Sequence, residues 1–277
     1  MGADNDRDEN RDAVLLSIVG VERAIAIEVD ELVSRIAAVV NHGVSCAPIE
    51  NTASGKTACA ITIAGRLYTV IAMSHAVPPG DLAVAVQAAY GWTQAGDAVR
   101  RSCAHYIVAS LSAPGGHAEA VQQSADLTTI TATLLDLVPA TFVYWGSGDA
   151  LVEPSAFRAA AEAMVMQNRP PVLNWVQFRL LPGRGAGAPG MIGMLTTGLR
   201  PFVGREIEMD PMPATPVEVA RLTVRLAEHL IREGPIFADG DSVDIGGNAN
   251  VLVHLVEKGR VNDGPSFQIR MPERSGI

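Results

Sequence analysis

Short β-rich runs alternate along this chain with longer segments whose apolar residues recur at helical spacing, and this alternation constrains the fold most. Val14–Val19, Cys59–Ile63 and Leu67–Met73 have the length and composition of strands. After the first of these runs, Asp30 offers an N-cap to a segment in which apolar residues recur every three or four positions up to Val40. In a chain of 277 residues, this mixture predicts an α+β protein with mostly antiparallel sheet.

The first half of the chain, residues 13–112, predicts a strand, a helix, a hairpin, a helix and a strand. The hairpin turns at Ala64–Arg66, the second helix begins after Asp81, and the last strand covers Tyr106–Leu111. This order is the βαββαβ plan of a ferredoxin-like unit.

A loop at residues 113–116 begins the second half, residues 113–277. Its clearest element is a helix with Thr215 as N-cap, Pro216 at the first position and Glu218 completing a capping box. Residues 172–181 are predicted to form a central strand. We therefore expect two ferredoxin-like or related α/β-sandwich halves, preceded by a disordered acidic tail at residues 1–12.

The charge balance excludes one class of function. The chain has 21 Lys and Arg against 30 Asp and Glu, a formal net charge of −9. Nucleic-acid binding is not expected, because it needs clustered basic residues, whereas an acidic surface favours a basic protein partner. No run of ~18 apolar residues predicts a membrane span. Three cysteines without CxxC spacing are typical of a reducing compartment, so we expect a cytoplasmic protein.

Several short motifs carry a family resemblance. They are Tyr144-Trp145-Gly146, Gly198-Leu199, Phe202-Val203-Gly204 with Glu206, Gly234-Pro235, and Asp239-Gly240-Asp241. From roughly Thr141 to the C-terminus, the chain resembles the bacterial domain of unknown function 4261 (DUF4261). The resemblance implies no reaction and no catalytic residue, and the motifs themselves are typical of turns and caps.

Two motifs resemble ligand-binding loops but lack residues that those loops need. Ser54–Thr57 resembles the end of a phosphate-binding loop, yet Glu50 stands where a glycine is required. Asp239, Asp241 and Asp244 suggest a calcium loop whose remaining ligand positions are missing. We predict no cofactor and no metal site, and an ordinary polar turn in both places.

Three carboxylates alternate along one predicted strand. Glu206, Glu208 and Asp210 should share one face of it. Such a face either chelates a metal or is solvated, and the solvated face is the commoner case. Glu206 is retained as a candidate binding residue.

Two histidines and one tryptophan complete the candidates. His75 lies between a predicted strand and a Pro-Pro-Gly turn, and His105 begins a strand whose end could lie beside it. Trp92 follows a glycine and is a candidate for stacking on a ligand, with a role in core packing as the simpler interpretation.

The sequence contains no complete catalytic signature, so we expect a non-catalytic cytosolic binding protein, for instance a toxin-neutralising (immunity-like) or accessory protein. The alternative is an enzyme or small-molecule sensor with a pocket between the two halves, lined by His75, His105 and Glu206. A homo-oligomeric protein also stays open, and an uncovered apolar sheet face would favour it.

Overall fold

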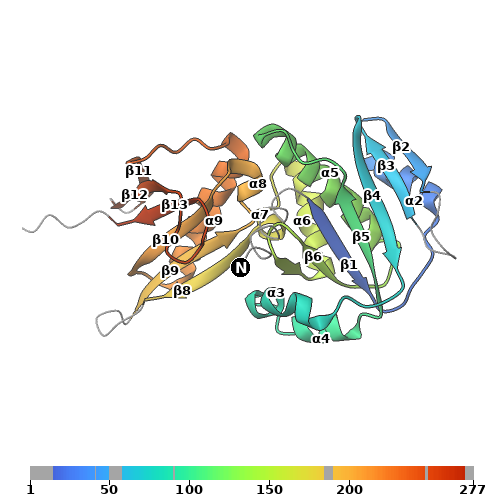
Figure 1. Ribbon diagram of the computed structural model, residues 1–277, viewed down its shortest axis with the longest axis horizontal. Helices are drawn as coiled ribbons and strands as arrows, with labels where there is room; N and C mark the ends of the chain where they lie inside the picture. Colours follow the sequence, from blue (N-terminus) through green and yellow to red (C-terminus); the bar gives the residue numbers. More distant parts are fainter. Residues whose placement is uncertain are drawn as a thin grey trace, which may run out of the picture. The chain divides into compact units, whose positions relative to one another are not determined.

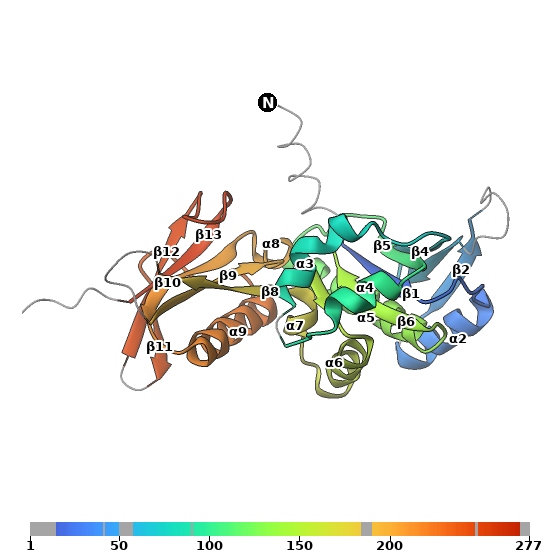
Figure 2. The same cartoon turned by 90° about the horizontal axis from the view of Figure 1, so that it is seen from below.

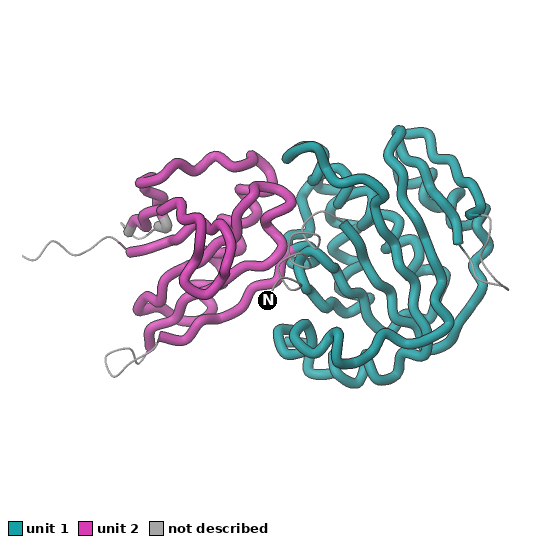
Figure 3. The backbone as a smooth tube through the Cα atoms, in the orientation of Figure 1, with its two compact units in different colours: residues 1–175 teal, residues 176–277 magenta. Residues whose placement is uncertain are grey.

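The computed structural model describes residues 15–40, 42–49, 58–89, 91–183, 190–246 and 249–271. The chain divides into two compact units, unit 1 (Met1–Trp175) and unit 2 (Val176–Ile277), shown in Figure 3. Each unit combines helices with one sheet, and the strands are mostly antiparallel, so the predicted α+β class is confirmed. The expected boundary at residues 112 and 113 lies inside unit 1, because strands from both sides of it join one sheet. The acidic tail at residues 1–12 lies outside the described residues.

Unit 1 contains a seven-stranded sheet in the order β2-β3-β4-β5-β1-β6-β7 (Figure 1). Its strands are β1 (Leu16–Val21), β2 (Val44–Pro48), β3 (Ala58–Ile63), β4 (Arg66–Met73), β5 (Ala104–Ser110), β6 (Ala140–Trp145) and β7 (Ala150–Val152). Its helices are α2 (Val29–Val39), η1 (Pro79–Leu82), α3 (Ala83–Ala88), α4 (Ala95–Arg101), α5 (His117–Leu135), α6 (Pro154–Gln167) and α7 (Val172–Trp175). The predicted order of strand, helix, hairpin, helix and strand is present, and β2 is an edge strand that was not predicted.

One face of the unit 1 sheet is buried under helices. Figure 2 shows α2, α5 and α6 together on one side of this sheet. Buried and half-buried residues alternate along β3, which is the pattern of a strand with one covered face. The hydroxyls of Ser17 on β1 and Thr131 on α5 share a hydrogen bond of 2.6 Å, so Ser17 marks the covered face. Trp145 stacks on Trp175 at 6.1 Å and both are buried, as expected of core anchors.

Unit 2 contains a six-stranded sheet in the order β11-β12-β13-β10-β9-β8. Its strands are β8 (Gln177–Pro182), β9 (Met191–Thr197), β10 (Glu206–Pro213), β11 (Ser242–Gly246), β12 (Ala249–Val256) and β13 (Ser266–Arg270), and its helices are α8 (Arg200–Val203) and α9 (Pro216–Glu233). Only β10 and β13 pair in parallel. The predicted capping box of α9 is confirmed, since Thr215 and Glu218 bond to each other's backbone. The hydroxyl of Thr223 on α9 lies 3.9 Å from the sulfur of Met209 on β10, so Met209 faces the helix.

The segment before β8 differs from its prediction. Residues 172–175 form the short helix α7, because the backbone N–H groups of Asn174 and Trp175 bond to the carbonyl of Pro171. The strand begins only at Gln177 and lies at the edge of its sheet, not at its centre. In the part of the chain that the structure describes, no helix combines the length and apolar character that crossing a bilayer requires.

Candidate functional site

Two sequence-predicted site residues, His75 and His105, are in contact in unit 1. Their ring centroids lie 5.3 Å apart in an edge-on arrangement. Nδ1 of His105 donates a hydrogen bond of 2.7 Å to the backbone carbonyl of His75, which fixes the ring proton at Nδ1. Burial lowers the pKa of His105, which favours its neutral form, whereas His75 is exposed. The pair ties the start of β5 to the segment after β4.

Trp92 packs in the second helical layer of unit 1. It is partly buried and contacts a cluster that contains Leu82 of η1, Ala95 of α4 and Phe142 of β6. The same cluster includes Val77, two residues after His75. The structure therefore explains Trp92 as a packing residue that holds α3 and α4 on the sheet.

Glu206, the fourth candidate, lies in unit 2, where its own turn surrounds its carboxylate. It is 4% exposed and accepts hydrogen bonds from the hydroxyl of Thr196 at 2.7 Å and from the backbone N–H of Gly198 at 2.8 Å. The N–H groups of Leu199 and Arg200 also donate to it, at 3.1 and 3.3 Å. Burial raises the pKa of Glu206, while these donors act in the opposite direction. With four donors around it, this carboxylate fixes the turn that begins α8.

The next two carboxylates on β10 both contact Arg260, one through its backbone and one through its side chain. Glu208 is 2% exposed and accepts from the backbone N–H groups of Arg260 at 3.0 Å and Val261 at 3.3 Å. Asp210 forms ion pairs with Arg260 at 3.0 Å and Arg270 at 3.3 Å. The three side chains share one face, as predicted. Glu206 holds the turn before α8, whereas Glu208 and Asp210 both hold the loop that contains Arg260.

The Asp239-Gly240-Asp241 motif forms a polar turn. Asp239 accepts from the N–H of Leu255 at 2.9 Å, and Asp241 accepts from the N–H of Ala238 at 2.7 Å, so both stabilise a turn. Within the described ranges, no group of three His, Cys, Asp or Glu could hold a metal ion. The Ser54–Thr57 motif lies outside the described residues.

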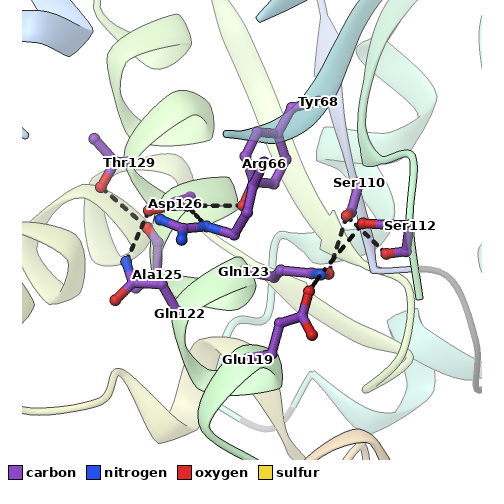
Figure 4. Close-up of polar contacts among 10 residues, drawn as sticks. All are labelled: Arg66, Tyr68, Ser110, Ser112, Glu119, Gln122, Gln123, Ala125, Asp126 and Thr129. Atoms are coloured by element: carbon purple, nitrogen blue, oxygen red, sulfur yellow. Dashed lines mark hydrogen bonds and ion pairs between the residues drawn. The ribbon is translucent and has the colours of Figure 1, made fainter. Parts of the chain in front are cut away.

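A buried polar network joins α5 to the sheet of unit 1 (Figure 4). Asp126, at 3% exposure, accepts hydrogen bonds of 2.7 Å from Nε of Arg66 and from the hydroxyl of Tyr68 on β4, and one of 2.9 Å from Gln122. Burial raises the pKa of Tyr68, and the neighbouring Asp126 raises it further. These groups saturate the carboxylate, so the network stabilises the contact between helix and sheet. Sequence analysis missed it, because a single Asp in a helix pattern gives no signal of its strand partners.

A second part of the network closes the N-terminal end of α5. Gln123 is fully buried, accepts from the hydroxyl of Ser110 at 3.0 Å and donates to Glu119 at 3.0 Å. Glu119 in turn accepts from the backbone N–H of Gly115 at 2.7 Å. The chain from β5 through the loop to α5 is thus held by consecutive hydrogen bonds (Figure 4).

A groove with a volume of about 330 Å³ lies between α2, α5 and α6. Three of its apolar side chains are exposed: Val39 at 42%, Val165 at 53% and Met166 at 86%. Charged side chains also line it; Asp136 pairs with Arg158 at 2.9 Å, and Glu162 is exposed. Exposed apolar side chains gathered in a hollow with a charged rim are typical of a binding surface.

The second face of the unit 1 sheet, opposite α2, α5 and α6, carries two rows of side chains. The register places Ile71, Ile107 and Ile18 side by side across β4, β5 and β1, which we name the isoleucine row. The adjacent row, two residues further along β3, β4 and β5, is Ala60, Thr69 and Ala109, which we name the small row; on β1 this row ends in the larger Leu16. Most of these side chains are half-buried and Thr69 is buried. Helices α3 and α4 cover the part of this face near β6 and β7 and reach β1, where Ile18 packs against their cluster.

The fold and the site together define a two-unit α+β protein whose buried carboxylates fix its own turns and layers. Residues 195–270 of unit 2 match the family described as Domain of unknown function (DUF4261), so the predicted resemblance to this family is confirmed over these residues. The match contains the Glu206 turn and the loop over Glu208, and it leaves the Tyr144-Trp145-Gly146 motif outside. Comparisons with curated proteins and with solved structures give no significant match.

Proposed function

We propose that this chain is a non-catalytic binding protein that engages a protein partner through the groove between α2, α5 and α6. The observation that carries the proposal is the exposure of Val39, Val165 and Met166 within one hollow. A partner that inserts an apolar side chain into the groove would bury these three side chains together. A buried apolar cluster of this kind usually contributes most of the binding free energy of an interface.

The rim of the groove indicates the chemistry of the partner. Asp136 is paired with Arg158, whereas exposed Glu162 has no ion pair among the described residues. With a net charge of −9 on the whole chain, a partner that flanks its apolar side chain with Lys or Arg is favoured. This is the basic protein partner expected from the composition.

We place this role in the cytoplasm of a bacterial cell, as an immunity-like protein that neutralises a toxin or as an accessory protein. A toxin gene adjacent to this one, whose product binds the purified chain, supports the immunity-like form. A neighbouring toxin that acts unchanged in its presence contradicts that form.

Photo-crosslinking tests the groove directly. A photo-reactive amino acid at Met166 should capture the partner in host cells, and the purified pair can then be titrated. Met166→Glu and Glu162→Lys should each weaken binding by about 10- to 100-fold, because one places a charge in the apolar hollow and the other reverses the rim. The matched control is Val84→Glu, since Val84 on α3 is 58% exposed and lies outside the groove. Equal affinity of all variants would show that the groove is not the binding site.

One observation favours the sensor alternative, namely the contact between His75 and His105. Glu206 does not support it, because its oxygens are engaged inside unit 2. The alternative predicts that a small molecule shifts the NMR signals of both histidine rings and that His75→Ala abolishes the shift. Binding that leaves both rings unaffected contradicts it.

A further inference from the structure

The second face of the unit 1 sheet carries no charged side chain on β2, β3 and β4. On β3, residues Ala58, Ala60 and Thr62 alternate with buried residues, and on β4 the corresponding positions are Leu67, Thr69, Ile71 and Met73. Arg66 of β4 points to the other face, where it bonds Asp126. A strand face that contacts only solvent usually carries polar or charged residues, so this composition is that of a covered surface.

We propose that a second copy of this chain covers this face, so that the protein forms a two-fold symmetric dimer by packing sheet on sheet. On β4 and β5 the isoleucine row is a ridge and the small row beside it is a trough, because Ile71 and Ile107 extend further than Thr69 and Ala109. A two-fold axis that runs parallel to the rows and between them brings each ridge over the trough of the other copy. The two rows therefore supply both halves of a self-complementary contact, as an isologous interface requires.

The size of the face allows a weak dimer. The four strands β2 to β5, spaced at about 4.8 Å and about 22 Å long, present roughly 420 Å² per copy, or about 850 Å² for the pair. This is below the size of a standard specific interface, so it predicts a weak, transient dimer with a dissociation constant in the micromolar range or above. Because this face has no charges, it does not complement a strongly basic or acidic partner. A surface that is equally apolar, such as the same face of a second copy, fits it better.

The dimer surface is distinct from the groove of the proposed function. Asp126, Ser17 and Tyr68 place α5 on the first face of the sheet, and the groove lies on the outer side of α5 and α6. The dimer can therefore form whether or not a partner occupies the groove.

Analytical ultracentrifugation of the full chain over a concentration series tests the proposal. The wild type, with a monomer mass of 29.1 kDa, should shift to twice that mass as its concentration rises through the micromolar range. Ile107→Lys, at the centre of the ridge, should weaken association by at least about 100-fold, because the dimer would bury unpaired charges. Ala60→Lys tests the trough on a neighbouring strand and should do the same. Val217→Lys is the matched control, because Val217 is 57% exposed on α9 and lies in neither proposed surface, and it should associate like the wild type.

Circular dichroism must show that each variant is folded. If Ile107→Lys does not fold, Ala60→Lys provides the test. A wild type that stays monomeric at high micromolar concentration overturns the proposal. So does a dimer that both folded lysine variants leave intact, since it must form through another surface. Loss of partner binding in Met166→Glu with an unchanged dimer would confirm that the two surfaces act separately.

Discussion

The two sheets of this protein place their polar groups on opposite sides. In unit 1, the charged groups lie beneath α5, where Asp126 holds Arg66 and Tyr68, and the second face is mostly apolar and carries no charge on β2, β3 and β4. In unit 2, the face toward α9 is apolar, with Met209 against the helix, and the carboxylates lie on the other face. There, the backbone of residues 260–262 bonds to Glu208. The comparison teaches that a loop covers the polar face of unit 2, whereas the apolar face of unit 1 is left for another molecule.

The largest expected effect tests the polar layer of unit 1. Asp126→Ala leaves Arg66 and Tyr68 without their acceptor and should lower the free energy of unfolding by about 3–5 kcal/mol. The measurement is denaturant unfolding followed by tryptophan fluorescence. Asp136→Ala is the control, because Asp136 is 46% exposed in its pair with Arg158, and it should cost about 1 kcal/mol or less. Equal costs for the two variants would show that the layer under α5 is not the structural tie we describe.

The corresponding change in unit 2 is Glu206→Ala. It removes the acceptor of three backbone N–H groups and should destabilise unit 2 by about 2–4 kcal/mol. Hydrogen exchange should show faster exchange at Gly198 and Leu199, while amides of unit 1 keep their protection. Glu257→Ala is the control, because its carboxylate is 82% exposed in a surface pair with Arg205. A stability loss that spreads evenly over both units would contradict a local role.

Two glycines, one in each unit, lie so close to a neighbouring group that an added Cβ would clash. Substituting them should lower the free energy of unfolding by a smaller amount. A Cβ at Gly20 in unit 1 would lie 2.1 Å from the ring of Phe142, and one at Gly193 in unit 2 would lie 2.3 Å from the carbonyl oxygen of Met209. Gly20→Ala and Gly193→Ala should each cost about 1–3 kcal/mol in thermal unfolding. Gly80→Ala meets nothing within 4 Å and serves as the reference. If Gly193→Ala melts like the wild type, the pairing of β9 with β10 is less tight than described.

The last test is a pH dependence confined to unit 1. Burial raises the pKa of the Cys59 thiol from 9.0 to about 12. The unfolded thiol ionises above pH 9 while the folded thiol stays protonated, so this contribution to stability is complete below pH 9 and is lost between pH 9 and about 12. The wild type should lose up to about 1.4 kcal/mol per pH unit more than Cys59→Ala in this window.

Urea unfolding between pH 8 and pH 11 measures the difference between the two proteins. Cys103→Ala is the matched variant, because Cys103 is exposed, and it should follow the wild type. Parallel curves for the wild type and Cys59→Ala would contradict the burial of this thiol.

Local chemistry made part of the fold predictable. The capping box of α9 and the hairpin turn at Ala64 and Gly65 use signals contained within a few residues, and both are confirmed. The sequence divides the chain at residues 112 and 113, whereas the compact units divide after Trp175, because the pairing of β1 with both β5 and β6 joins segments far apart in the sequence. Strand β2 was missed, because its stability comes from pairing with β3 and not from its own pattern.

The candidate site was predictable to a lesser degree. His75 and His105 were placed near each other through the ends of their strands, and the register between Met73 and His105 accounts for their contact. The roles of Glu206 and Glu208 depend on turns at residues 198–200 and 260–262, which approach β10 only in the folded sheet. The alternation of carboxylates along the strand predicts that they share one face, but it does not predict which loops cover that face.

The edges of the unit 1 sheet decide how large an assembly of this protein can grow. The outer strand β2 ends at Pro48, which has no N–H to offer a further strand, and β7 at the other edge has three residues. Sideways addition of copies, the route to filaments, is therefore disfavoured at both ends. For the unit 1 sheet, a face that is buried by one neighbour, between edges that disfavour a further strand, favours a closed pair over a growing stack.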